Sequence, residues 1–197
     1  MANKMIMISN TWRRKRELAT ALAELGLPAH QLITETPTRW GSRQQTIQRV
    51  LEQEKALTQV LRADRKTRHL VLTWQDVEVL ESVNNALSPL VEFTDALSGE
   101  QYVSVSYLKP VLHLFNEQVL KPQDDDTPLT KDIKTNILQY LNEKYAEPFT
   151  QDLLDMASLL DPRFKMTYMK AERVDHLKSK AAAEMESLVA EQAKSAV

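Results

Sequence analysis

The sequence predicts an all-α protein, folded as an irregular bundle of several helices. Only three of its 197 residues are glycine, while 43% are hydrophobic and 26% are charged. Apolar residues recur at spacings of three and four along most of the chain, which is the period of a helix with one buried face. Because no strand-rich block interrupts these patterns, the helices are expected to pack on one another through short connections.

Residues 3–25 are expected to form the first helix, which Gly26 and Pro28 end. Its apolar positions are Met5, Ile8, Trp12, Leu18, Leu22 and Leu25. The same helix carries a basic turn, made of Arg13, Arg14, Lys15 and Arg16. This turn has three interpretations: a solvated helix face, a contact for phosphate groups, or a nuclear-import signal.

The central stretch, residues 36–62, begins at a turn and is expected to continue as a helix. Pro37 ends the preceding connection, and Thr38 can cap the first backbone N–H groups. The apolar positions at helical spacing are Ile47, Val50, Leu51, Leu57, Val60 and Leu61. The first turns of a helix offer N–H donors and partial positive charge to an anion. They carry three arginines and a tryptophan, which suit a phosphate chain with a base to stack: Arg39, Trp40, Arg43 and Arg49.

A polar, basic turn or short helix is expected at residues 63–69. Thr73 and Asp76 then resemble a capping box at the start of another helix. Its apolar positions are Val77, Leu80, Val83, Leu87, Leu90, Val91 and Leu97. Pro89 should kink this helix or split it in two.

The next helix is expected over residues 104–121, and it contains Pro110. This proline either bends the helix or lies in a first turn after a break. The core candidates here are Val111, Leu112, Leu114, Phe115 and Val119. His113 lies beside them without a second ligand at metal-binding spacing, so we expect no metal there.

Residues 122–128 form the clearest surface loop. Its three aspartates are expected to be solvated, because a calcium loop needs alternate ligand spacing and a glycine. Thr127 should cap the following helix, with Pro128 at its first position. One face of that helix holds Leu129, Ile133, Ile137, Tyr140, Leu141 and Tyr145. Pro148 should stop it, and a shorter helix should cover about residues 150–159.

The turn at residues 159–164 is expected to have a structural role. Asp161 can cap, Pro162 suits a first turn and Arg163 can pair with a carboxylate, while the turn's apolar side chains, Leu159, Leu160 and Phe164, can pack. The last helix, residues 171–192, carries Val174, Leu177, Ala181, Met185 and Leu188 at near-heptad spacing. It either seals the core or pairs with another chain.

Composition restricts the class of function. Without cysteine, this chain holds neither a disulfide, a thiolate metal site nor a zinc finger. No apolar run is long enough to span a membrane, and the first ten residues do not resemble a signal peptide. Because the sequence offers no glycine-rich loop and no nucleophile paired with a base, we expect no catalytic residue, metal or cofactor in it. A cytosolic or nuclear protein fits these observations.

Charge is divided along the chain. Residues 1–75 hold 13 Lys and Arg against 6 Asp and Glu, whereas residues 76–197 hold 12 against 21. The basic part contains the turn at Trp40, which suggests a segment that faces a polyanion. The alternative is that ordinary solvated helix faces merely differ in sign.

Two motifs in this order resemble one family. The Thr-Arg-Trp turn followed by RVLEQEKALTQVL, together with LLDPRFK downstream, is similar to the central region of hAT-superfamily transposases and of their domesticated relatives, the BED zinc-finger proteins. In that family a ribonuclease-H-like domain is interrupted by a helical insertion domain. The resemblance therefore implies a leading helix and connection at residues 1–35, an insertion-like domain at 36–170 and a C-terminal helix and tail at 171–197.

The resemblance also implies where the chemistry lies. The two aspartates and one glutamate that hold divalent metal in such enzymes belong to the ribonuclease-H-like part, and Glu184 and Glu186 here do not match the glutamate's setting. Arg39 and Trp40 match residues near the active site, where the tryptophan stacks on a flipped base at a cleaved DNA end. Trp40 either stacks in this way or only packs.

Two functions are therefore expected, both in a nuclear protein. The first is a non-catalytic module that contacts DNA through Arg39, Trp40, Arg43, Arg13, Arg14 and Arg16. The second is a protein-interaction scaffold of a transposase-derived transcriptional regulator, whose acidic second half and last helix bind partners or self-associate. An independent enzyme and a membrane partner are not expected.

Overall fold

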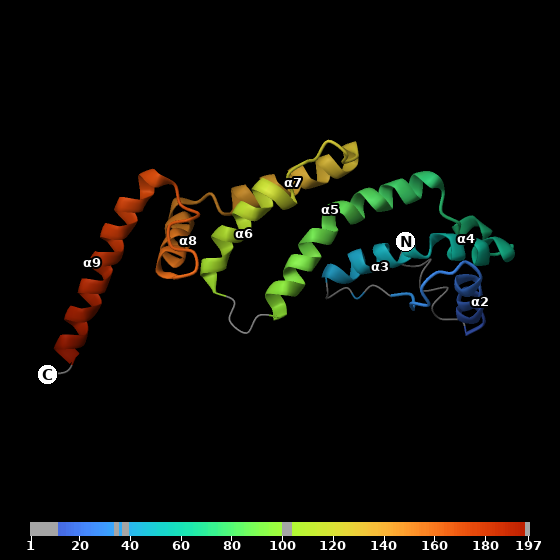
Figure 1. Ribbon diagram of the computed structural model, residues 1–197, viewed down its shortest axis with the longest axis horizontal. Coiled ribbons are helices and arrows are strands. Elements are labelled where there is room, and N and C mark those ends of the chain that lie inside the picture. Colours follow the sequence, from blue (N-terminus) through green and yellow to red (C-terminus); the bar gives the residue numbers. More distant parts are fainter. Residues whose placement is uncertain (1–11, 34–35, 37–39, 100–103, 196–197) are drawn as a thin grey trace. The chain divides into compact units, whose positions relative to one another are not determined.

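The computed structural model of the protein (Figure 1) describes residues 12–33, 36, 40–99 and 104–195. The prediction of an all-α fold is confirmed, because these residues form eight α-helices with short 3₁₀ and π-helical turns and contain no strand. None of the helices in the described ranges has the length and apolar character needed to cross a membrane.

Contacts divide the chain into two compact units. Unit 1 comprises Met1–Asp95 with Asp124–Ile133, and unit 2 comprises Ala96–Gln123 with Lys134–Val197. The divisions expected after residues 35 and 170 stay predictions.

Unit 1 begins with α2 (Trp12–Glu24), which packs against α4 (Glu54–Ala63). The predicted start of this helix, residues 3–11, lies outside the described residues. Its predicted end is confirmed, because Gly26 takes a left-handed φ of 63°. The amide of Leu27 then donates to the carbonyl of Leu22 at 2.9 Å, and the amide of Gly26 donates to that of Ala23 at 3.2 Å. This pair of bonds is the Schellman arrangement, which a glycine adopts without steric cost.

The core of unit 1 lies between α2, α3 (Trp40–Glu52), α4 and the first turns of α5 (Trp74–Gly99). Five of the six apolar positions predicted for the central stretch are buried, and Leu51 packs partly against them. The expectation of one continuous helix over this stretch is wrong, because the chain breaks at Gln53. The side chain of Gln53 is fully buried and donates to the carbonyl of His30 at 2.7 Å, so a segment far away in sequence stabilises the break.

The predicted capping box starts α5. The carboxylate of Asp76 accepts from the amide of Thr73 at 2.9 Å, and the amide of Asp76 donates to the Thr73 hydroxyl at 3.2 Å. Pro89 lies inside a helix that stays continuous but is bent (Figure 1), which confirms the kink and not the split. A proline has this effect because it removes one helical hydrogen bond.

The second segment of unit 1 is joined to α5 by hydroxyl groups. Thr127 caps α7 (Pro128–Lys144) as predicted, because its Oγ1 accepts from the amide of Thr130 at 3.1 Å. The same hydroxyl lies 2.8 Å from the hydroxyl of Ser82 on α5. The hydroxyl of Thr130 in turn donates to the carbonyl of Ser82 at 3.2 Å, and the side chains of Thr130 and Ser82 are buried.

Unit 2 is built around α8 (Pro148–Leu160), which packs on a 3₁₀ turn, η2 (Val105–Tyr107), on α6 (Leu108–Leu114) and on α9 (Ala171–Ser195). A π-helical turn, η3 (Phe115–Val119), continues α6. Pro110 therefore lies in the first turn of α6, as in the second predicted alternative, although η2 runs directly into that helix without a break. Pro148 is the first residue of α8, where it lacks no hydrogen bond. Among the described residues of this unit, the buried apolar ones are Val111, Phe115, Leu120, Leu154 and Leu177.

A buried carboxylate joins three of these helices. The side chain of Asp155 on α8 is only 2% exposed, and one of its oxygens lies 2.8 Å from the ammonium of Lys109 on α6. The other oxygen lies 3.1 Å from the guanidinium of Arg173 on α9. Two cations thus lie against one buried negative charge, and their attraction offsets the cost of desolvating Asp155.

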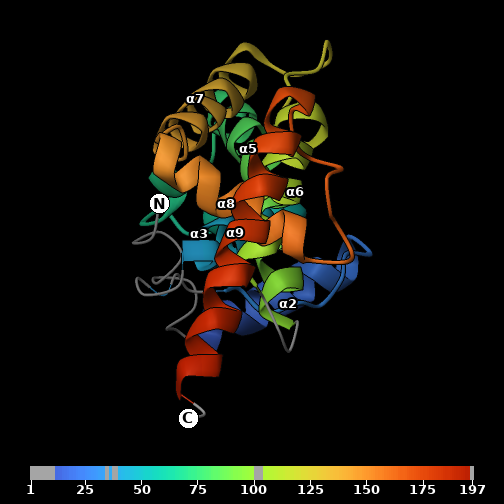
Figure 2. The same ribbon diagram turned by 90° about the vertical axis from the view of Figure 1, so that its left-hand side faces the viewer.

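Several apolar positions that the sequence placed on helix faces or in the turn at residues 159–164 are exposed, so they do not belong to the core. They are Leu129 and Tyr140 on α7, Leu160 at the end of α8, and Met185 and Leu188 on α9. On α9 the reason is length, because Leu177 is fully buried whereas the second half of the helix runs beyond the end of α8 (Figures 1 and 2). An apolar stripe predicts a buried face only as far as a neighbouring element extends.

Candidate nucleic-acid interface

The predicted DNA-contacting turn lies at the start of α3. Trp40 is the first residue of that helix, while Arg39 and the side chain of Trp40 lie outside the described residues. The first turn is held by Ser42, whose buried hydroxyl accepts from the amide of Thr36 at 2.9 Å and donates to its carbonyl at 2.9 Å. Gly41 lies against Val91 of α5, where a Cβ would approach the valine side chain to 3.4 Å.

Arg43 and Arg49 follow on α3 in different settings. Arg43 is exposed, one turn into the helix. Arg49 is half-buried, and its guanidinium lies 3.2 Å from the carboxylate of Glu52 on the same helix. Of these two arginines, Arg43 therefore offers the more accessible charge to an anion.

The basic turn of α2 presents two of its three predicted arginines to solvent. The side chain of Arg13 is 84% exposed and pairs with Glu17 one turn later, at 2.9 Å. Arg16 is also exposed, and both residues line an open groove of about 440 Å³ between α2 and α4. Arg14 instead is 16% exposed and lies 3.1 Å from the carboxylate of Asp64. The structure thus uses Arg14 to join α2 to the segment that follows α4.

The end of α4 and the residues that follow it, 62–69, are here called the basic loop. The sequence of this loop is RADRKTRH, and four of its exposed residues are cations: Arg62, Arg65, Lys66 and Arg68. The sequence predicted a turn here but not a site. Asp64 is its only acidic residue, and the amide of Lys66 and then the guanidinium of Arg14 lower the pKa of its carboxyl group. The loop therefore carries excess positive charge at its surface.

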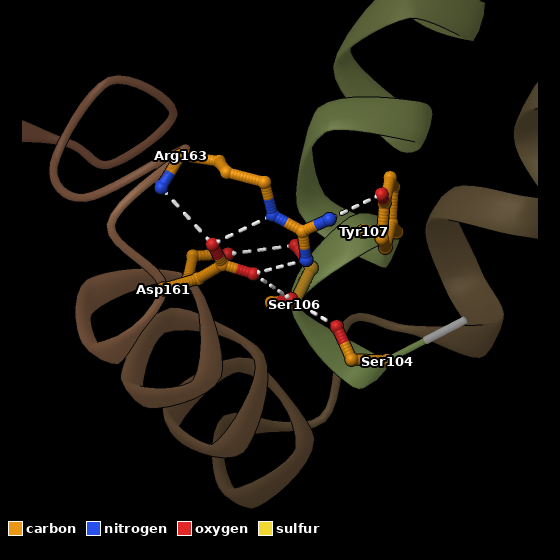
Figure 3. A network of polar contacts seen from close by, with 6 residues as sticks. Ser104, Ser106, Tyr107, Asp161 and Arg163 are labelled. Carbon is orange, nitrogen blue, oxygen red and sulfur yellow. Dashed lines mark hydrogen bonds and ion pairs between the residues drawn. The ribbon is translucent and has the colours of Figure 1, made fainter. Parts of the chain in front are cut away.

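The turn at residues 159–164 forms a second polar cluster, in unit 2 (Figure 3). The carboxylate of Asp161, at the C-terminus of α8, accepts from the hydroxyl of Ser106 at 2.6 Å and from the guanidinium of Arg163 at 2.7 and 2.9 Å. Hydrogen bonds from Arg163 and then from Ser106 hold the pKa of Asp161 well below its ordinary value. The guanidinium of Arg163 also lies over the ring of Tyr107, 4.5 Å from its centroid, and bonds to its hydroxyl.

These contacts are those of a structural joint. Every partner of Asp161 and Arg163 named above belongs to η2 or to the turn itself, so the cluster holds α8 against η2. The rings of Phe164 and Tyr107 meet edge to face, with centroids 5.2 Å apart, as the prediction of a packing role requires. Across the described part of the chain, no three His, Asp or Glu side chains gather as a metal site would need.

Comparison with known proteins gives one relevant relative. The chain is 28% identical over 178 residues to the human protein named zinc finger BED domain-containing protein 4, a match that covers 88% of this chain and 14% of that protein. The chain is thus a distant homologue of part of a BED zinc-finger protein, and the predicted resemblance to that group is confirmed. No family model and no solved structure matches the chain.

Proposed function

We propose that this chain, a distant homologue of a BED zinc-finger protein, is a non-catalytic helical module of a hAT-transposase-derived nuclear protein and contributes DNA contact. One observation carries the proposal: Arg13, Arg16 and Arg43 remain exposed on unit 1, although the whole chain has a formal charge of −2. Exposed guanidinium groups bind phosphate oxygens through paired hydrogen bonds. Catalysis, if the parent protein has it, belongs to residues outside this chain.

Within this proposal the start of α3 contacts a DNA end. Trp40 stacks on an unpaired base, and Arg39 and Arg43 bind the adjacent phosphates. The bonds between Ser42 and Thr36 support this role, because they hold the first turn of α3, which carries Arg43. Arg14 acts differently from the exposed arginines: it is half-buried and pairs with Asp64 after α4, and so positions its neighbours.

The test is DNA binding by fluorescence anisotropy, comparing a hairpin with a blunt duplex. Replacing Trp40 with alanine should weaken hairpin binding about 5- to 140-fold, since stacking on one base is worth roughly 1 to 3 kcal/mol. Trp74→Ala is a matched control, because Trp74 also begins a helix and its side chain is 73% exposed. A folded Trp40→Ala variant with unchanged hairpin affinity would refute the stacking role.

The arginines of α2 are tested by salt dependence. Each phosphate contact adds about 0.9 to the slope of log affinity against log salt concentration. An Arg13→Ala, Arg16→Ala double variant should therefore have a slope shallower by about 2. An unchanged slope would remove α2 from the interface.

Exposed apolar residues favour a second candidate function, a protein-interaction scaffold. Phe149, Leu153 and Leu160 are exposed on α8 at spacings of four and seven, so they share one face of the helix. Met185, Leu188 and Val189 are exposed together on α9. Apolar side chains grouped in this way are typical of binding surfaces.

This alternative is tested through mass in solution. If α9 mediates self-association, light scattering should give a mass that rises with concentration, and Leu188→Glu should abolish the rise. A wild-type chain that stays monomeric at high concentration would exclude self-association through this face.

A further inference from the structure

We propose that the basic loop, residues 62–69, is a second phosphate-binding element that contacts a nucleic-acid backbone without reading its sequence. This inference rests on the proposed DNA contact but concerns a different element from the turn at Trp40.

The loop has positive charge that its own acid does not neutralise. Arg62, Arg65, Lys66 and Arg68 are exposed around a single carboxylate, that of Asp64. That carboxylate is already engaged: one oxygen accepts from the amide of Lys66 at 2.9 Å, and the other lies 3.1 Å from the guanidinium of Arg14. Three of the four cations are arginines, whose planar fork matches the oxygens of a phosphate.

The backbone of the loop is fixed before any ligand binds. Thr67 is buried, and its hydroxyl bonds to the carbonyl of Leu61 at 3.1 Å and to that of Asp64 at 3.2 Å. The amides of Thr67 and Arg68 both donate to the carbonyl of Asp64, at 3.0 and 3.1 Å. Binding therefore orders little backbone, which lowers the entropic cost of association.

The loop is also joined to the basic turn of α2. The pair between Arg14 and Asp64 connects segments 50 residues apart in sequence, and α2 packs along α4, whose last two residues belong to the basic loop. Cations from both segments consequently lie on unit 1 around the same pair. An extended polyanion reaches several such charges at once, whereas a single free phosphate meets only one or two. The backbone of a nucleic acid provides regularly spaced charges of this kind.

The experiment compares two triple variants of the full chain. The first, Arg62→Ala, Arg65→Ala, Lys66→Ala, removes three charges of the loop but keeps Asp64 and Thr67, which hold its backbone. The matched control, Lys121→Ala, Lys170→Ala, Lys178→Ala, removes three exposed charges from unit 2. Circular dichroism melts establish that both variants fold, and anisotropy then measures their binding to a hairpin and to a duplex.

We expect the loop variant to lose affinity for both DNAs by the same factor. Three lost contacts should reduce the salt slope by about 2.7, so that between about 50 and 200 mM salt the variant loses roughly 40-fold less affinity than the wild type. The control should keep the wild-type slope. Poly-glutamate, as a peptide polyanion, should bind more weakly than single-stranded DNA of the same charge.

The outcomes separate this inference from the proposed function. If Trp40→Ala leaves hairpin binding unchanged while the loop variant still loses duplex affinity, the stacking role fails and the loop assignment holds. If the wild type binds but the loop variant has the slope of the control, the loop assignment is overturned. Poly-glutamate bound as tightly as DNA overturns it in favour of an acidic protein partner. A wild type that binds neither DNA at low salt overturns both.

Discussion

Removing the buried carboxylate of Asp155 should destabilise unit 2 strongly. Its side chain is 2% exposed, and in its absence Lys109 and Arg173 lose their shared counter-charge. Breaking a buried ion pair from one side typically costs about 3–5 kcal/mol. Both cations keep a second partner, since Lys109 donates to Gln151 at 2.7 Å and Arg173 pairs with Asp152. We therefore expect Asp155→Ala to cost about 3 kcal/mol, the lower end of that range.

The assay is urea unfolding followed by far-ultraviolet circular dichroism, with a carboxylate on the same helix as control. The side chain of Asp152 is 31% exposed, and it pairs with Arg173 and with Lys180 at 3.4 Å. Because solvent screens such pairs, Asp152→Ala should cost no more than about 1 kcal/mol. Both variants remove one negative charge from α8, so their difference isolates burial.

Equal effects of the two substitutions would refute this reasoning. So would a loss below about 1 kcal/mol for Asp155→Ala, because water would then have to reach the remaining cations. The expected loss is a large fraction of the roughly 5–15 kcal/mol that stabilises a typical domain.

Three further substitutions test local features. Arg163, and then Ser106, lower the pKa of Asp161, so its carboxylate stabilises the fold above its unfolded pKa. This contribution is lost as the pH falls below about 4. The difference in melting temperature between wild type and Asp161→Asn should therefore close over that range. Thr73→Ala removes the cap of α5 and should cost about 1 kcal/mol in urea unfolding. Gly26→Ala should cost about 1 kcal/mol through backbone strain alone, because no atom lies within 4 Å of the added Cβ.

Each of these has a contrary result. A melting gap at Asp161 that stays constant from about pH 6 to pH 3 would contradict the lowered pKa. Thr73→Ser keeps the capping hydroxyl, so the same loss with serine would show that capping is not the cause. Gly26→Asn should cost less than Gly26→Ala, because asparagine tolerates the left-handed region, and the reverse order would contradict the strain argument.

Local signals in the sequence were sufficient wherever neighbouring residues determine the structure. The end of α2 at Gly26, the box at Thr73 and the cap at Thr127 each depend on hydrogen bonds within a few residues. The apolar spacing around Val50 and Leu57 similarly predicted the buried faces of α3 and α4. Helix geometry fixes such relations without reference to the rest of the chain.

The failures depend on partners far away in sequence. The break at Gln53 is stabilised by the carbonyl of His30, 23 residues earlier, and no periodicity contains that bond. Arg14 lies in the same basic turn as Arg13 and Arg16, and spacing does not indicate that it is half-buried and pairs with Asp64, 50 residues later; its DNA contact stays a prediction. The roles of Arg39 and Trp40 stay predictions, as do the nuclear location and the binding of DNA. Leu188 lies at near-heptad spacing but is exposed, because spacing alone does not indicate where the opposing helix ends.

The return of the chain to unit 1 at Asp124–Ile133 constrains how the protein is made. Ser82 acquires its partners Thr127 and Thr130 only after more than forty further residues have followed it. During translation, unit 1 therefore cannot complete its hydrogen bonds until the ribosome has passed Ile133. By then the segment Ala96–Gln123 of unit 2 has already been synthesised, whereas α8 has not. Neither unit corresponds to one continuous piece of the polypeptide, so unit 1 can be completed only after the first segment of unit 2 has been synthesised.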